Sequence, residues 1–162
     1  MIKLRIALLM PTLLWAALGL PPVFADTSLL TSSAREARVF GLYLGSTDRD
    51  EFYRAIVGSG GERLFRRSSS DVYLITSIYP KAANCRVIFD ADERVQEVIF
   101  NFNPGSLSKE ELLAIVEQRY GKSQSYEPGL QGEGSYYWLF PHSGIRLYYL
   151  PTSTSQIQYY LR

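Results

Sequence analysis

Residues that carry reactive chemistry are scarce in this chain of 162 residues. It has one cysteine, Cys85, and one histidine, His142. A single cysteine cannot form an intramolecular disulfide. One cysteine and one histidine are also too few ligands for the common zinc sites unless carboxylates complete the ligand set. We therefore predict no metal and no cofactor. Alternation within its strand places Cys85 beside Val87 and Phe89, which indicates a small buried apolar residue.

An excess of charge of one sign is also absent. The chain has 17 basic and 16 acidic residues, for a net charge of +1. Lys3 and Arg5 belong to an N-terminal segment that we expect to be removed, which leaves 15 basic residues against the same 16 acidic ones. A nearly neutral protein has no general field that attracts nucleic acid or an anionic membrane, so we exclude nucleic-acid partners.

Long hydrophobic runs are missing except near the N-terminus. Lys3 and Arg5 precede an apolar stretch over 6–20, two prolines follow it, and Ala25 offers a small residue for cleavage. This order is typical of a signal peptide, here residues 1–25, whereas a membrane anchor needs about 20 apolar residues. No cysteine stands at the cleavage point, so a lipoprotein is not expected. We predict a periplasmic or secreted protein with no stable membrane anchor after cleavage.

Candidate catalytic groups do not form a pattern. His142 and Ser143 are adjacent in a turn, and neighbouring residues do not face each other as a base and a nucleophile must. Gly58 to Gly61 ends a helix, whereas a phosphate-binding loop begins one. We predict no catalytic residue and rank an enzyme third among the hypotheses, because His142 would have to meet carboxylates from elsewhere in the fold.

A weak internal similarity appears when the chain is shifted by 60 residues. Gly45-Ser46 then aligns with Gly105-Ser106, and Glu51 aligns with Glu111. Similar turn and helix signals follow in the same order in both halves. We therefore divide the chain into a signal peptide (1–25), a lead-in (26–44) and two α+β repeats (45–104 and 105–162) that form one compact domain.

Helix signals open each predicted repeat, and strand signals follow them. Ser46 or Thr47 is a candidate N-cap for the first helix, and Ser108 with Glu111 forms a capping box for the second, which Gly121 closes. Period-two alternation then predicts strands. Their ranges are 73–79, 85–90, 95–102, 136–140, 145–150 and 156–161, with weaker candidates at 63–67 and 123–127.

These elements predict an α+β fold of two pseudo-repeats. Each repeat has one helix followed by three or four antiparallel strands, and the helices pack on one face of the sheet. Alternation leaves the other face open to solvent or to a partner. On that face tyrosine and arginine, which are enriched at protein interfaces, stand together. We predict that the partner-binding residues are Arg86, Ile88, Arg146, Tyr148, Gln158 and Tyr160. The alternative is that strands simply favour tyrosine.

Three segments carry a family resemblance. The lead Gly41-Leu42-Tyr43-Leu44-Gly45-Ser46 and the strands around Val87 to Asp90 and Arg94 to Val98 resemble the small envelope modules of the SmpA/OmlA (BamE) type. Two such modules in tandem resemble beta-lactamase inhibitory protein. The resemblance implies helices on an antiparallel sheet whose open surface grips another protein. The chain departs from these families in having no lipidated cysteine, no disulfide pair and one helix per repeat, and no functional residue carries over.

The leading functional hypothesis is an exported soluble protein-binding module of the inhibitor, immunity or envelope assembly type. Its partner is expected to be another envelope or secreted protein, and the sequence leaves the oligomeric state open. The alternative is a periplasmic protein that holds a lipid or glycan in a pocket between helices and sheet, lined by Trp138 and tyrosines.

Overall fold

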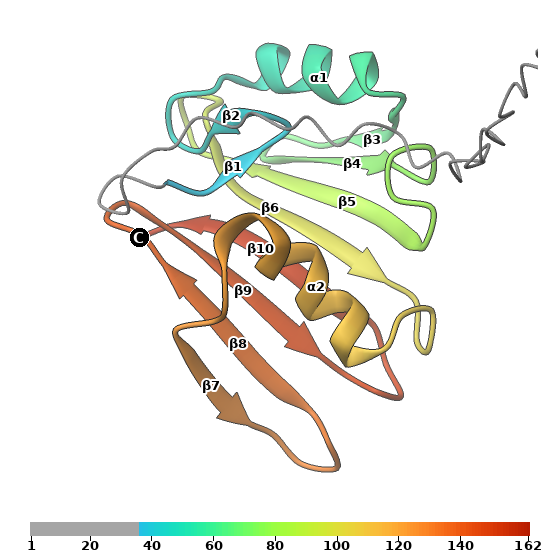
Figure 1. Ribbon diagram of the computed structural model, residues 1–162. Helices are drawn as coiled ribbons and strands as arrows, with labels where there is room; N and C mark the ends of the chain where they lie inside the picture. Colours follow the sequence, from blue (N-terminus) through green and yellow to red (C-terminus); the bar gives the residue numbers. More distant parts are fainter. Residues whose placement is uncertain (1–35) are drawn as a thin grey trace, which may run out of the picture.

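One continuous antiparallel sheet dominates the structure. The computed structural model describes residues 36–162, and eight of its strands pair in the order β3-β4-β5-β6-β10-β9-β8-β7 (Figure 1). Their bounds are β3 (Glu62–Arg66), β4 (Ser70–Leu74), β5 (Ala82–Phe89), β6 (Val95–Phe102), β7 (Ser125–Pro128), β8 (Gly134–Leu139), β9 (Ser143–Tyr149) and β10 (Ser155–Leu161). A separate two-stranded ribbon consists of β1 (Arg38–Val39) and β2 (Leu42–Tyr43).

Two short helices complete the fold of the described residues. In α1 (Arg49–Gly58) the N-cap is Asp48, whose carboxylate accepts the Glu51 N–H at 2.7 Å. The predicted cap at Ser46 or Thr47 was wrong, because the Thr47 hydroxyl instead donates to the Tyr43 carbonyl. The capping box of α2 (Lys109–Tyr120) is confirmed, with Ser108 and Glu111 satisfying each other's backbone N–H groups.

The predicted fold class was wrong. Instead of two helix-plus-strand repeats, the described residues form a mostly β structure with 44% strand and two helices of 10 and 12 residues. The helices bury few side chains, namely Arg49, Phe52 and Ile56 in α1 and Leu112 and Val116 in α2. Most of the core therefore comes from strands.

The pairing of β6 with β10 joins the strands β3 to β6 and the strands β7 to β10 in one sheet. Phe100 lies opposite Ile157 and Val98 opposite Tyr159 along this junction. An unpaired β6 or β10 would present a row of free backbone N–H and C=O groups, and the pairing satisfies both rows. Eight strands thus become a single sheet whose remaining edges are β3 and β7.

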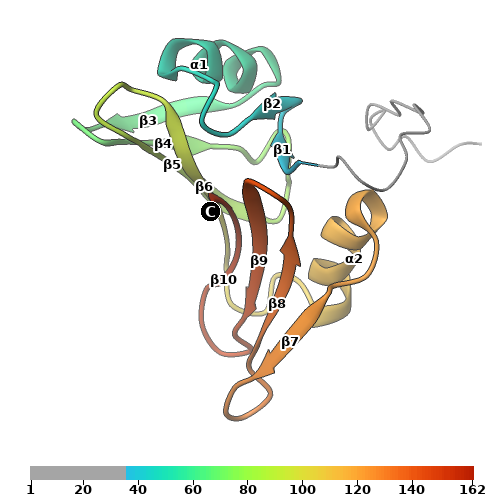
Figure 2. The same cartoon turned by 90° about the vertical axis from the view of Figure 1, so that its left-hand side faces the viewer.

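The core lies between one face of this sheet and the elements above it. In Figure 2 the two helices and the β1–β2 ribbon lie on the same side of the strands. Alternation in the strands places large apolar side chains on that side, as period two requires. The buried ones include Tyr73, Cys85, Val87, Phe89, Val98, Phe100, Phe102, Trp138, Ile145, Leu147, Ile157 and Tyr159. The Phe100 ring makes edge contacts with Phe40, Tyr79 and Tyr159.

Strand boundaries differ from the prediction mainly in β4. The expected strand over 73–79 was wrong beyond Leu74, where β4 ends, because the Ile75 carbonyl accepts the N–H groups of Ile78 and Tyr79 and turns the chain. The weaker candidates at 63–67 and 123–127 are confirmed as the edge strands β3 and β7. Pro128, which has no N–H to donate, ends β7 at such an edge.

A buried ionic cluster fastens α1 to the sheet. Arg49, at the start of α1, donates to both carboxylate oxygens of Asp71 on β4, at 3.2 and 2.6 Å. Its remaining N–H groups reach Glu93 and the carbonyls of Ser68 and Arg67. The Asp71 hydrogen bond is the largest cause that raises the pKa of Arg49. The Tyr73 hydroxyl also donates to Asp71, so every polar group of the cluster has a partner.

The predicted signal peptide, residues 1–25, lies outside the described residues. Within 36–162, neither helix is long and apolar enough to cross a membrane. Residues 38–43 of the predicted lead-in form the β1–β2 ribbon, and Val39 is buried in the core.

Candidate functional site

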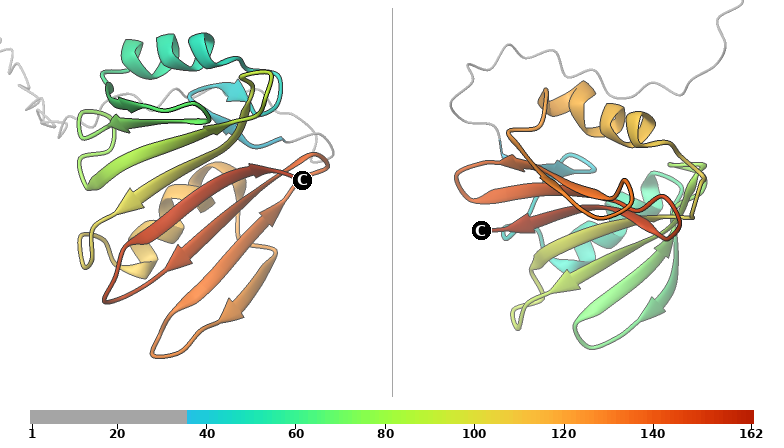
Figure 3. Two further views of the ribbon diagram at one scale, coloured as in Figure 1. Left: turned by 180° about the vertical axis from the view of Figure 1, so that it is seen from behind. Right: turned by 90° about the horizontal axis from the view of Figure 1, so that it is seen from below.

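Among residues 36–162, no helix lies over one face of the eight-stranded sheet. Figure 3 shows this side in its left view, with β5, β6, β10, β9 and β8 in front and α2 behind them. We call this side the open face. The six predicted partner-binding residues belong to it by register, because each lies next in sequence to residues that are buried on the covered side. They are Arg86, Ile88, Arg146, Tyr148, Gln158 and Tyr160.

The strand register sets the neighbours on the open face. Arg86 lies opposite Ile99, Ile99 opposite Gln158, and Gln158 opposite Arg146. Arg146 in turn lies opposite Tyr137 on β8. The structure therefore brings Arg146 and Gln158 together directly, with Tyr148 two residues along the same strand.

Arg86 and Ile88 lie apart from this group. Three strand spacings separate Arg86 from Arg146, about 14 Å at the usual distance between strands. Arg86 is exposed and stands between Val72 and Ile99, which offer it no polar partner. Ile88 lies beyond it, opposite Glu97.

Arg146 is the most enclosed cation on the open face. Its guanidinium carbon lies 5.2 Å from the ring centre of Tyr148 and 5.8 Å from that of Tyr137. One terminal nitrogen donates to the Ser135 hydroxyl at 3.2 Å, while Nε is buried and has no hydrogen-bond partner among the described residues. Within 36–162 no carboxylate forms an ion pair with Arg146.

The tyrosines around Arg146 are held by contacts of their own. The Tyr137 hydroxyl donates to Glu127 at 2.6 Å, and this hydrogen bond is the main cause that raises the pKa of Tyr137. The ring of Tyr160 lies directly over Gly144, where an added Cβ would come within 2.5 Å of the ring. Tyr148 and Tyr160 are both half-buried, so each combines a packed body with an accessible edge.

Amide side chains fill the neighbouring rows of the open face. Gln156 donates to Asn101, and Asn101 donates to Asn84, at 2.9 and 2.8 Å. Gln158 donates to Glu97 at 2.5 Å. These bonds fix the side chains laterally across β5, β6 and β10. The carboxylate of Glu97 is therefore engaged by an amide and not by an arginine.

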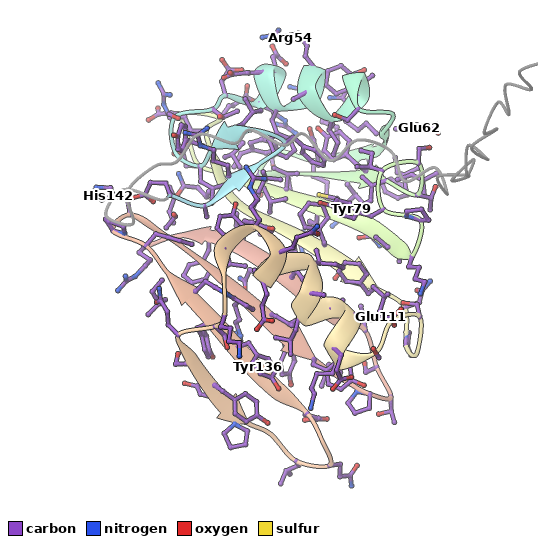
Figure 4. All side chains as sticks on the ribbon, viewed as in Figure 1. Arg54, Glu62, Tyr79, Glu111, Tyr136 and His142 are labelled. Carbon is purple, nitrogen blue, oxygen red and sulfur yellow. The ribbon has the colours of Figure 1, made fainter. Side chains whose placement is uncertain are left out.

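Two functional candidates escaped the sequence analysis. Tyr137 and Ser135 lie on β8 and contact Arg146, yet neither was predicted. The Tyr136-Tyr137-Trp138 run predicts a strand. The sequence does not fix its register, and a shift of one residue would move each of these side chains to the other face of the sheet. The structure places Tyr136 on the covered side near α2, as Figure 4 shows, which leaves Tyr137 on the open face.

Other sequence candidates do not assemble into a reactive site. The Ser143 hydroxyl donates to the Glu36 carboxylate at 2.6 Å, and the same carboxylate accepts the backbone N–H of His142, not its imidazole. His142 lies in an exposed turn. Burial raises the pKa of the Cys85 thiol well above its usual range, which disfavours the reactive thiolate. Among the residues described, no three His, Cys, Asp or Glu side chains converge as a metal site would require.

A small cavity lies between the β1–β2 ribbon and the start of β9. Its volume is about 150 Å³, and its lining includes Tyr43, Leu44, Ser143 and Leu161. Small-molecule sites usually enclose about 300 to 1,000 Å³. This cavity therefore gives no support to a pocket for a lipid or glycan.

Comparisons with known proteins assign no family to this chain. No protein-family model matches the sequence, and no curated protein matches it. The chain is similar in structure to a DUF4309 family protein (YjgB) from Bacillus subtilis, with 13% identity, a TM-score of 0.47, and coverage of 75% of this chain and 83% of that one. A match at this level carries no inference about function. The resemblance to the SmpA/OmlA (BamE) family and to beta-lactamase inhibitory protein stays a prediction.

Proposed function

We propose that this chain is an exported protein-binding module whose open face, centred on Arg146, holds another envelope or secreted protein. The observation that carries the proposal is an arginine that lies between two tyrosines on the open face and has no ionic partner in residues 36–162. Binding hot spots are enriched in tyrosine and arginine because these side chains bury large areas and still offer polar atoms.

The position of Arg146 within the sheet supports this choice. It lies on β9, which has neighbours on both sides, β8 and β10. Hydrogen-bonded central strands move little, so the side chains they carry are already placed when a partner arrives. The rows of fixed amides around Arg146 supply the polar rim that surrounds the centre of most interfaces.

Affinity capture followed by direct binding measurement tests the proposal. The full chain, Arg146→Ala and Tyr148→Ala are each immobilised and exposed to an envelope extract, and a protein retained by the wild type is then purified for calorimetry. Both variants are expected to weaken its Kd about tenfold or more. The matched control is Arg54→Ala, because Arg54 is exposed on the outer side of α1 (Figure 4) and should leave the Kd unchanged.

Two outcomes would contradict the proposal. Equal Kd values for the wild type and both open-face variants would place the contact elsewhere on the molecule. Loss of binding with Arg54→Ala alone would assign it to the helix side. The cavity beside β9, with a volume of about 150 Å³, is small for a lipid or glycan, which disfavours the alternative of a binding pocket there.

A further inference from the structure

We infer that Arg146 is the receptor for a carboxylate side chain, an aspartate or glutamate, of the partner protein. This inference rests on the proposed function, because it names the chemistry that the open face recognises. The arginine site is defined by Arg146, Tyr137, Tyr148 and Ser135.

The positive charge of Arg146 favours a carboxylate as the bound group. A half-buried guanidinium has lost part of its hydration, and no carboxylate within 36–162 compensates its charge. The two carboxylates of the open face nearest in register are already engaged, Glu97 by Gln158 and Glu127 by Tyr137. A carboxylate from outside is the group that an arginine fork binds best, through two parallel charge-assisted hydrogen bonds.

The guanidinium of Arg146 is also preorganised for binding. Arginine carries large rotamer entropy, which a partner must overcome when the side chain is free. Here the Tyr148 and Tyr137 rings and the Ser135 hydroxyl restrict the guanidinium, and Glu127 restricts Tyr137. The restricted fork loses less entropy on binding, so an approaching carboxylate gains more net free energy.

Arg86 provides a built-in comparison for the same inference. It has the same charge and lies on the same face, but it is exposed and flanked by Val72 and Ile99. No aromatic ring within the described residues lies under its guanidinium. A simple excess of positive charge would treat the two arginines alike, whereas the arginine site predicts selectivity for Arg146.

Nuclear magnetic resonance of the full chain can test this selectivity with small probes. The Nε–H signals of the arginine side chains are followed during titration with N-acetyl-aspartate methylamide and with its neutral counterpart, N-acetyl-asparagine methylamide. The signal of Arg146, assigned from its loss in Arg146→Lys, is expected to shift saturably with the aspartate probe. The aspartate probe should bind about fivefold or more tightly than the asparagine probe.

Variants separate the arginine site from charge alone. Arg146→Gln should abolish the preference for the aspartate probe, Arg146→Lys should weaken it, and Arg54→Gln on α1 should leave it unchanged. Equal binding of the two probes, or a shift at Arg86 in place of Arg146, would overturn the inference. Saturable binding of a neutral oligosaccharide such as maltotriose at Arg146, without an aspartate preference, would also overturn it and indicate a glycan surface.

The two proposals fail in different ways. If Arg146→Ala releases the captured protein but the aspartate probe shows no preference, the protein-binding function stands and the carboxylate inference is wrong. If the probe prefers aspartate but neither open-face variant alters capture, the arginine site exists and the proposed function is wrong.

Discussion

Arg49 and Arg146 both lie against aromatic rings, but their charges are treated in opposite ways. Arg49 is 3% exposed, contacts the Phe89 ring, and meets Asp71, Glu93 and two backbone carbonyls. Arg146 is half-buried and has one hydroxyl partner, with no carboxylate in the described residues. The two arginines therefore differ in burial and, more sharply, in whether a carboxylate of the described residues compensates their charge.

The difference shows what each position does for the protein. Arg49 lies on α1, and its partners come from β4 and from the turns that precede β4 and β6, so its bonds join elements that are distant in sequence. The contacts of Arg146 come from β8 and β9, which already pair through their backbones. Removing Arg146 should therefore leave the fold intact, whereas removing a partner of Arg49 should not.

The largest effect is expected from Asp71→Ala, which leaves the Arg49 cation buried without its main partner. Breaking a buried ion pair in this way costs about 3 to 5 kcal/mol of unfolding free energy. Urea denaturation of the variant and the wild type measures the loss. The double variant Arg49→Met with Asp71→Leu is the control and should recover much of it, because no charge is then left unpaired. A loss below about 1 kcal/mol for Asp71→Ala would contradict the structural role.

A smaller loss is expected from Gly144→Ala on the open face. The new Cβ would lie 2.5 Å from the Tyr160 ring, so the ring must move. Such overpacking costs about 1 to 3 kcal/mol. Urea denaturation measures the loss, and the second substitution Tyr160→Ala should remove the clash, so that Gly144→Ala costs less in that background. An undiminished cost would mean that the strain lies in the backbone and not in the ring.

Arg146→Met tests the other side of the comparison and should change stability by less than about 1 kcal/mol. The substitution keeps the apolar stem against the tyrosines and removes a buried Nε that has no partner in the described chain. Urea denaturation under the same conditions gives the value. A loss above about 2 kcal/mol would make Arg146 a structural residue like Arg49 and would weaken the proposed function.

The smallest effect concerns the titration of Tyr137. Its pKa is raised because the hydroxyl donates to the Glu127 carboxylate, which favours the protonated phenol. The folded state thus gains stability that is fully present below the unfolded pKa of about 10 and is lost as pH rises through the folded value. Glu127→Gln should lower the pKa of Tyr137 in an ultraviolet titration, with Tyr137→Phe identifying the signal. An unchanged pKa would contradict this hydrogen bond.

Short-range signals in the sequence predicted much of the local structure. Alternation assigned Cys85, Val87 and Phe89 to the buried face, because side chains on a strand follow a strict period of two. The capping box placed the start of α2, because its two bonds join residues only three apart. These features depend on neighbours along the chain.

Long-range pairings could not be predicted in this way. The bond between Arg49 and Asp71 spans 22 positions, and the junction of β6 with β10 spans more than fifty. This junction joins all eight strands in one sheet, and the fold is mostly β instead of the two expected helix-plus-strand repeats. Sequence alone did not distinguish Arg146 from Arg86. The residues that make the difference, Tyr137 and Ser135, contact Arg146 from another strand.

The ring of Tyr160 over Gly144 also has a spectroscopic consequence. An aromatic ring current shifts the resonance of any proton that lies against the ring, and the Gly144 Hα that occupies the place of a Cβ lies against the ring of Tyr160. Gly144 is two residues from Arg146 on β9. Movement of Tyr160 when a partner docks would therefore change the Gly144 Hα shift, which gives the protein an internal reporter of binding that requires no label at the interface.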